Sequence, residues 1–148
     1  MIKRYLPWVM LLALLVVCGC GGSKPKKPST TAANGKINWL TDYNAGLAQA
    51  KKENKPMMVE VSTTWCSACK WLEETVLSEK VVIDASRRFV PVRVDADKQV
   101  ELKDKLKANQ YPTIVFINPD GTEVERVIGA VPYQVMLESM NKVAPEQK

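Results

Sequence analysis

Four segments of the chain have the pattern of apolar and polar residues that predicts strands. Each segment is short, rich in β-branched residues and bounded by proline or polar residues, as strands are. The expected strands are residues 57–62, 89–95, 113–117 and 122–128. TIVFI, residues 113–117, is apolar throughout, which predicts a strand in the middle of a sheet. TEVERVI, residues 122–128, alternates between polar and apolar positions, which predicts an edge strand.

Apolar residues at helical spacing predict helices around these strands. The helices are expected from Thr41 or Asp42 to residues 52–56, from Cys66 to about Leu77, from about Glu79 to Arg88, over residues 98–109, and after Pro132. In the helix over 98–109, Val100, Leu102 and Leu106 have the spacing of core residues. In the last helix, Val135, Met136 and Met140 are expected to face the core.

The elements follow one another in the order α-β-α-β-α-β-β-α. Helices between the early strands favour parallel pairing, whereas the turn signal NPDG at residues 118–121 favours a hairpin between the last two strands. A chain of 148 residues is long enough for one domain with a hydrophobic core. The order predicts the α/β class, with a mixed central sheet and helices on both faces.

The first residues have the composition of an export signal. Lys3 and Arg4 precede an apolar run at residues 5–17, which is shorter than the roughly 17–25 residues that cross a membrane. The run ends LVVCGC, which resembles the bacterial lipobox and implies cleavage between Gly19 and Cys20 with a lipid on Cys20. An uncleaved anchor or an ordinary secreted protein is the alternative.

Composition divides the chain into three parts: a lipoprotein signal (1–19), the lipidated Cys20 with a flexible tether (20–36), and a folded domain (37–148). The net charge of +5 belongs to the first two parts, which contain six basic and no acidic residues. Residues 37–148 carry 15 basic and 16 acidic side chains, so nucleic-acid binding has no support. The tether lysines are compatible with an anionic membrane surface or with a solvated linker.

Cys66 and Cys69 stand two residues apart in TTWCSACK, residues 63–70. A zinc site usually needs four ligands, but the chain has no histidine and would keep no free cysteine other than this pair after export. Covalent haem attachment needs a histidine after the second cysteine, where Lys70 stands. Metal and haem sites are therefore disfavoured, and no cofactor is expected.

A structural disulfide and a redox-active dithiol both remain open for this pair. A disulfide that closes so short a loop stabilises a fold little. Between the strand at 57–62 and the following helix, Cys66 would lie at the helix N-terminus, whose free N–H groups favour a thiolate. Cys69, one turn later, could attack a mixed disulfide formed at Cys66. This context favours thiol redox chemistry.

The cysteine segment and its flanks resemble the thioredoxin family. EVSTTWCSACK, residues 60–70, is similar to the active-site segment of the C-terminal thioredoxin-like domain of the membrane thiol:disulfide interchange protein. Residues 39–61 resemble the helix and strand before it, YPTIVFINPDG (111–121) the cis-proline segment and hairpin, and VIGAVP (127–132) the glycine loop. The resemblance spans about residues 39–140 and implies a thioredoxin-like fold.

By this resemblance, Cys66 is the attacking thiol and Cys69 the resolving thiol of a redox-active disulfide. The bond between Tyr111 and Pro112 is expected to be cis and to face the cysteines. The residues that the resemblance assigns to substrate binding are Trp65, Tyr111, Pro112 and Gly129.

Glu60 lies six residues before Cys66, where the family usually has a buried aspartate. Met58, Glu60 and Ser62 share one face of the expected strand. A carboxyl in an apolar strand tends to hold its proton near neutral pH, so Glu60 could exchange a proton with Cys69 as the disulfide opens. In the alternative interpretation, Glu60 points out of the sheet into solvent.

The function that these features favour is an exported, membrane-tethered thiol:disulfide oxidoreductase in the bacterial cell envelope, facing the periplasm or the exterior. Ser67 and Ala68 stand where strongly oxidising family members often have a histidine, which favours a reductase or an electron relay. The partners implied are protein substrates with disulfides or thiols and a membrane thiol transporter as electron donor. Two alternatives stay open: a thiol reductant for cytochrome c maturation, and a binding module whose cysteines are incidental.

Overall fold

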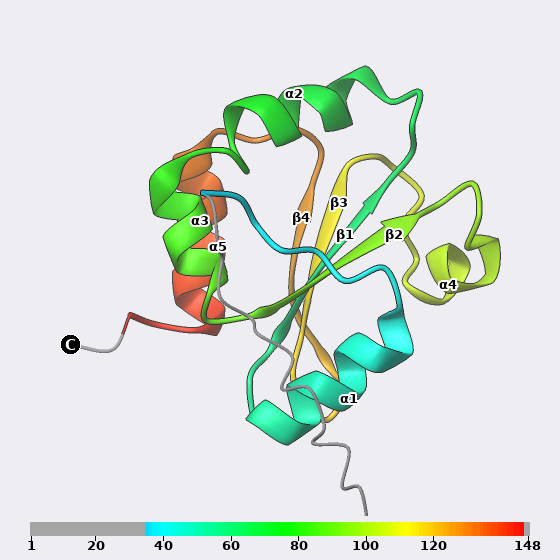
Figure 1. Cartoon of the computed structure of the whole chain (residues 1–148). Coiled ribbons are helices and arrows are strands. Elements are labelled where there is room, and N and C mark those ends of the chain that lie inside the picture. Colours follow the sequence, from blue (N-terminus) through cyan, green and yellow to red (C-terminus); the bar gives the residue numbers. More distant parts are fainter. Residues whose placement is uncertain (1–34, 147–148) are drawn as a thin grey trace, which may run out of the picture.

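The computed structural model describes residues 35–146, in which helices surround a central sheet (Figure 1). The signal, Cys20 and nearly all of the tether lie outside the described residues, so those predictions stay predictions. The helices are α1 (Tyr43–Glu53), α2 (Ser67–Thr75), α3 (Lys80–Ser86), α4 (Val100–Lys105) and α5 (Tyr133–Val143). The strands are β1 (Met57–Ser62), β2 (Val90–Asp95), β3 (Thr113–Ile117) and β4 (Glu123–Ile128).

The four strands form one mixed sheet in the order β2-β1-β3-β4. β1 runs parallel to β2, whereas β3 is antiparallel to both β1 and β4. Every residue of β3 is buried, and β4 is partly exposed at the edge, as their sequence patterns predict. The predicted α/β class and mixed sheet are therefore confirmed.

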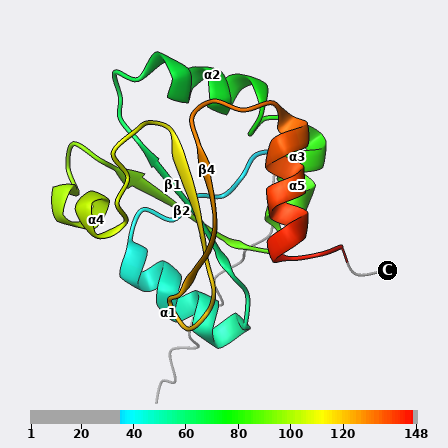
Figure 2. The same ribbon diagram turned by 180° about the vertical axis from the view of Figure 1, so that it is seen from behind.

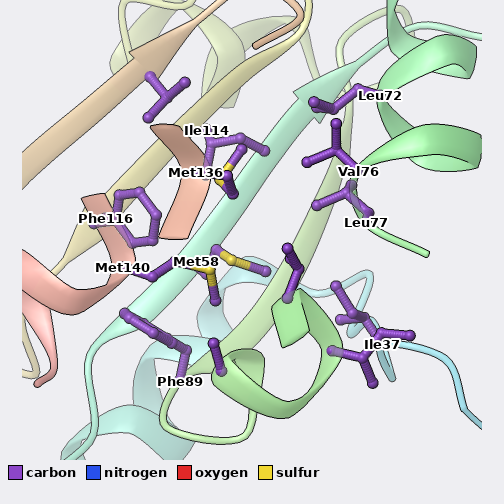
Figure 3. Close-up of a cluster of buried hydrophobic side chains, with 14 residues drawn as sticks. Ile37, Met58, Leu72, Val76, Leu77, Phe89, Ile114, Phe116, Met136 and Met140 are labelled. Atoms are coloured by element: carbon purple, nitrogen blue, oxygen red, sulfur yellow. The ribbon is translucent and has the colours of Figure 1, made fainter. Parts of the chain in front are cut away.

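Side chains of β1 alternate between two hydrophobic cores, one on each face of the sheet. Met57 and Val59 face the core covered by α1 and the segment around α4. Met58 faces the core covered by α2, α3 and α5, where α3 and α5 lie side by side in both views (Figures 1 and 2). Figure 3 shows this second core, whose labelled members include Leu72, Val76, Ile114, Phe116, Met136 and Met140.

Residues before α1 extend the sheet at the edge of β2. Leu40 forms a parallel bridge with Val92; its N–H donates to Pro91 O at 3.0 Å, and Arg93 N–H donates to Leu40 O at 2.7 Å. The Arg93 guanidinium lies over the Trp39 ring, 4.6 Å from its centre. This short segment covers one edge of the sheet.

The helix expected at residues 98–109 is shorter in the structure. Lys107 adopts a left-handed φ of 51°, which ends the helical path soon after Lys105. Val100 is 51% exposed, contrary to the prediction, whereas Leu106 is buried. The chain therefore places its core contact just after α4 and leaves the first turn in solvent.

In α5, the buried positions are Met136 and Met140, which are four residues apart and so lie on one face of the helix. Val135, also expected in the core, is 42% exposed, because it precedes this stripe by one residue and points to its side. None of the helices within residues 35–146 has the length and apolarity needed to cross a bilayer.

Candidate active site

Cys66 and Cys69 form a disulfide, with their Cα atoms 5.3 Å apart, at the start of α2. Cys66 is the N-cap of the helix, and its Sγ accepts the backbone N–H of Cys69 at 3.1 Å. The side chains are 6% and 5% exposed, respectively. The prediction that the first cysteine lies at a helix N-terminus is confirmed, and helix N–H groups are available to stabilise a thiolate there.

Local hydrogen bonds explain why the helix starts at this point. β1 ends at Ser62, and the N–H of Cys66 then donates to Thr63 O at 3.4 Å across a tight turn. The N–H of Lys70 donates to Cys66 O at 3.2 Å, which begins the helical pattern. The strand, turn and helix place the disulfide at the start of α2. Figure 1 shows α2 beyond the end of the sheet where β1 finishes.

Trp65 is a large exposed side chain beside the disulfide, with 68% of its surface accessible. Its indole Nε1 donates to Asp97 Oδ2 at 3.0 Å, and its ring meets the Tyr111 ring edge-on, with the centroids 6.1 Å apart. The structure thus brings the predicted residues Trp65 and Tyr111 together. Asp97 was missed, because no local pattern indicates a contact between residues 32 positions apart in the chain.

Pro112 is buried and follows a cis peptide bond from Tyr111, as the sequence predicts. The N–H of Gly129 donates to Pro112 O at 2.8 Å, so the loop after β4 is fastened to the proline segment. Gly129 adopts a φ of 85°, a conformation that favours glycine. The four residues assigned to substrate binding therefore form two contacting pairs, but their role in binding stays a prediction.

Glu60 is 2% exposed, which confirms that it is buried and excludes the solvated alternative. Its Oε2 accepts a hydrogen bond from Arg93 Nε at 2.6 Å, and Arg93 also forms an ion pair with Glu73 of α2. Burial raises the pKa of the Glu60 carboxyl above its ordinary value of 4.5, and Arg93 offsets part of this rise. Arg93 was not among the predicted site residues, because its partner lies on the neighbouring strand. The proton-transfer role of Glu60 stays a prediction.

Within residues 35–146, no group of three or more His, Cys, Asp or Glu side chains is arranged to hold a metal ion.

A family model described as thioredoxin-like matches residues 38–119, more than half of the chain. The chain belongs to the thioredoxin-like family. A thioredoxin H-type from Oryza sativa subsp. indica is 27% identical over 92 residues, which cover 60% of this chain and 70% of that protein. The thiol:disulfide interchange protein DsbD of Vibrio cholerae is 30% identical over 109 residues, which cover 70% of this chain and 18% of DsbD.

Solved structures agree with the thioredoxin-like assignment. A thioredoxin from Thermus thermophilus has a TM-score of 0.66 and 28% identity, over 73% of this chain and 87% of that one. DsbH oxidoreductase has a TM-score of 0.60 over 81% of this chain and 96% of that one; at 21% identity it supports the fold alone. Family membership and the Cys66–Cys69 disulfide make this chain a thioredoxin-like thiol:disulfide oxidoreductase.

Several relatives are longer than the region they share with this thioredoxin-like chain. The shared region is 49% of the chloroplastic protein CITRX1 of Nicotiana benthamiana and 37% of the chloroplastic protein HCF164 of Arabidopsis thaliana. The similarity to these proteins therefore concerns that region, and their further activities do not transfer to this chain.

Proposed function

We propose that the chain is an exported, lipid-anchored oxidoreductase that reduces protein disulfides or relays electrons to them. The observation that supports the redox chemistry most directly is the position of Cys66 Sγ, which caps α2 and accepts the backbone N–H of Cys69. Helix N–H groups stabilise a thiolate at this position, and the thiolate is the nucleophile in disulfide exchange.

In the reducing direction, the reaction starts from the dithiol. The Cys66 thiolate attacks one sulfur of a substrate disulfide, whose S–S bond breaks and whose other sulfur leaves as a thiolate. Cys69 then loses its proton and attacks Cys66 Sγ, so that the first substrate sulfur also leaves. Two electrons have passed to the substrate, and the protein holds the Cys66–Cys69 disulfide that the structure contains. A thiol donor must reduce this disulfide before the next cycle.

Two features support the reducing direction. Ser67 and Ala68, between the cysteines, provide no cationic side chain to stabilise the reduced thiolate beyond the helix itself. The similarity to DsbD, named a thiol:disulfide interchange protein, supports a membrane thiol protein as the electron donor of this chain. Exposed Trp65, with the half-buried Tyr111 ring against it, offers an apolar surface for an extended substrate near its disulfide.

The cell-envelope location is proposed from the sequence of residues 1–36, with a lipid on Cys20. Labelling cells with a fatty-acid analogue tests it. The chain should take up the label and sediment with membranes, and Cys20→Ala should do neither, whereas Cys18→Ala should do both. If Cys18→Ala abolishes the labelling and Cys20→Ala preserves it, the lipid is on Cys18 and the proposed lipid on Cys20 is wrong.

Reduction of a protein disulfide by the purified chain tests the redox function. The wild-type protein with a dithiol donor should reduce the disulfides of insulin, and Cys66→Ser should lose this activity. Cys69→Ser should accumulate mixed disulfides with its partners, because the resolving thiol is absent. An inactive wild type, or a Cys66→Ser variant of undiminished activity, would favour a binding module instead.

A further inference from the structure

The guanidinium of Arg126, in β4, donates to the α4–β3 connection, which is residues 106–112. Its Nη2 donates to Leu106 O at 2.7 Å, and its Nη1 donates to Lys107 O at 3.3 Å. Both carbonyls follow directly on α4, where the last carbonyls of a helix have no partner within the helix itself. A side chain of β4 therefore holds the start of the connection that leads to Tyr111 and Pro112.

Glu123 orients Arg126 for these contacts. Arg126 Nε donates to Glu123 Oε1 at 2.7 Å, and Arg126 Nη2 donates to Glu123 Oε2 at 2.8 Å. Two hydrogen bonds between a carboxylate and a guanidinium fix the plane of the guanidinium. The Arg126 side chain is 20% exposed and that of Glu123 44%. The arginine is therefore mostly buried, with an orientation that the ion pair and the two carbonyls set together.

Two further hydrogen bonds hold the rest of the α4–β3 connection. Thr113 Oγ1 donates to Gln110 O at 2.7 Å, and the N–H of Gly129 donates to Pro112 O at 2.8 Å. Gly129 follows Arg126 by three residues, so the last part of β4 and the residue after it contact the connection at both its ends. β3 begins and β4 finishes at the end of the sheet beyond which α2 lies (Figures 1 and 2).

The connection carries the aromatic ring that lies beside the disulfide. Tyr111 is half-buried, and its ring meets the exposed Trp65 ring edge-on. Val115, which is opposite Arg126 on β3, belongs to the core against which Tyr111 packs. Because the connection is held at few points, releasing it at Leu106 would loosen the Tyr111 ring and its contact with Trp65.

We propose that Arg126 is a positioning residue that makes the site selective for protein disulfides. By holding the start of the α4–β3 connection, it keeps the Tyr111 ring against Trp65 and so keeps this apolar surface in place before a polypeptide binds. A small disulfide reaches Cys66 without using that surface. The inference rests on the proposed thiol redox function, and Arg126 takes no part in the exchange of bonds between sulfurs.

The test uses the full chain with Cys18→Ser and Cys20→Ser, in which Cys66 and Cys69 are the remaining cysteines. Reduction of insulin with a dithiol donor gives KM and kcat for a protein disulfide. The reduced protein alone, mixed with dithiobis(nitrobenzoate), gives the rate with a small disulfide. In Arg126→Gln we expect KM for insulin to rise about two- to tenfold, while kcat and the rate with the small disulfide stay close to those of the parent.

Glu123→Gln is the matched control, because it removes the same ion pair but leaves Arg126 able to donate to Leu106 O and Lys107 O. It should raise KM much less than Arg126→Gln does. Tyr111→Ala shows whether Arg126 acts through the ring. Adding Arg126→Gln to Tyr111→Ala should raise KM no further, because the ring that Arg126 positions is gone.

An unchanged KM in Arg126→Gln, an equal rise in Glu123→Gln, or a further rise in the double variant overturns the proposal. An equal loss of rate with insulin and with the small disulfide also overturns it, since that would be a general disturbance of the site. If Arg126→Gln does not fold, Arg126→Lys replaces it, because a single ammonium cannot reach Glu123 and both carbonyls together. A parent protein that reduces neither substrate overturns the thiol redox function itself.

Discussion

At the scale of single residues, Glu60 places an ionisable carboxyl where water does not reach. Its side chain is 2% exposed, and Arg93 supplies the nearby positive charge. Because the pKa of Glu60 in the folded protein is raised above 4.5, the folded state binds this proton more tightly than the unfolded state does. The contribution of Glu60 to stability is therefore fully present below pH 4.5 and is lost as the pH rises through the raised pKa.

Arg93→Gln should increase the loss of stability that accompanies ionisation of Glu60 and extend it to higher pH. Without the arginine, the pKa of Glu60 rises further, so ionising the carboxyl costs more in the folded state. We expect the free energy of unfolding to fall by about 2 kcal/mol at neutral pH, and by much less at pH values where Glu60 is protonated in both proteins. Urea unfolding of both proteins over a pH series measures the difference. A deficit that is the same at every pH would show that the packing of Arg93, and not its charge, is what matters.

Asp97→Ala should affect substrate binding more than chemistry. The variant removes the acceptor that holds the Trp65 indole, and Trp65 is then free to adopt other rotamers beside the disulfide. One such hydrogen bond corresponds to about a two- to tenfold rise in KM for a protein disulfide, with little change in kcat. Steady-state reduction assays measure both constants, with Asp120→Ala, in the β3–β4 turn, as the control. A fall in kcat at unchanged KM would assign Asp97 a role in the chemistry.

The residues that sequence reasoning found are those whose environment is local in the chain. Cys66 precedes a helix, Pro112 precedes a buried strand, and Glu60 sits within an apolar strand, so periodicity and flanking residues suffice to place them. Arg93 and Asp97 were missed because their roles depend on contacts 33 and 32 residues away in the chain. Sequence patterns from one chain do not show which side chains meet across neighbouring strands.

At the scale of elements, the close contact between α1 and β2 depends on a glycine, which has no side chain. Gly46 is buried in α1, and a Cβ at this position would lie 2.4 Å from Val92 Cγ2. Real Cβ atoms do not approach other carbons so closely, and a valine in a buried strand has little freedom to move aside. The glycine therefore allows the helix to lie close against the strand.

Gly46→Ala should destabilise the fold although alanine favours helices. The gain in helix propensity is about 1 kcal/mol, and we expect overpacking against Val92 to exceed it and leave a net loss of about 1–2 kcal/mol. Thermal or urea unfolding measures the loss. In a Val92→Ala background, the same substitution should cost less, because the methyl group it meets is absent. An equal cost in both backgrounds would mean that Val92 is not the group that Gly46 accommodates.

Most elements could be predicted, because their patterns are strongly periodic. β1 and β3 have the predicted bounds, and β2 and β4 each begin one residue later than predicted. The failure concerns α4, where the spacing of apolar residues suggested a longer helix. The left-handed conformation of Lys107 ends that helix, and a lysine gives no sequence signal for such a turn.

At the scale of the whole molecule, two hydrophobic cores lie on opposite faces of one sheet, and neither core cluster includes Cys66 or Cys69. Both cysteines are nevertheless buried, 6% and 5% exposed, at the end of the sheet where α2 begins. The order of elements was sufficient to predict this layered arrangement. It could not indicate which face α2 covers, since that depends on how the chain crosses the end of the sheet.

Reducing the disulfide should leave the fold intact. The loop that it closes is short, so we expect the free energy of unfolding to change by less than about 2 kcal/mol. The parent for this test carries Cys18→Ser and Cys20→Ser, so that Cys66 and Cys69 are its remaining cysteines. Urea unfolding of the parent with and without a reductant measures the change. A variant of the parent that also carries Cys66→Ser and Cys69→Ser cannot form the disulfide and serves as the control. A reduced protein that unfolds in the absence of urea would restore the structural-disulfide interpretation.

The pairing of Leu40 with β2 has a consequence for shortened forms of the protein. Proteolysis or truncation that removes residues before Asp42 would strip the sheet of the strand-like segment at its border. The N–H of Arg93 and the carbonyl of Pro91 would then face solvent and could pair with a second molecule. A fragment that begins at Asp42 would keep Cys66 and Cys69 but would tend to self-associate through the exposed edge of β2. A recombinant domain intended to stay monomeric should therefore begin before Trp39.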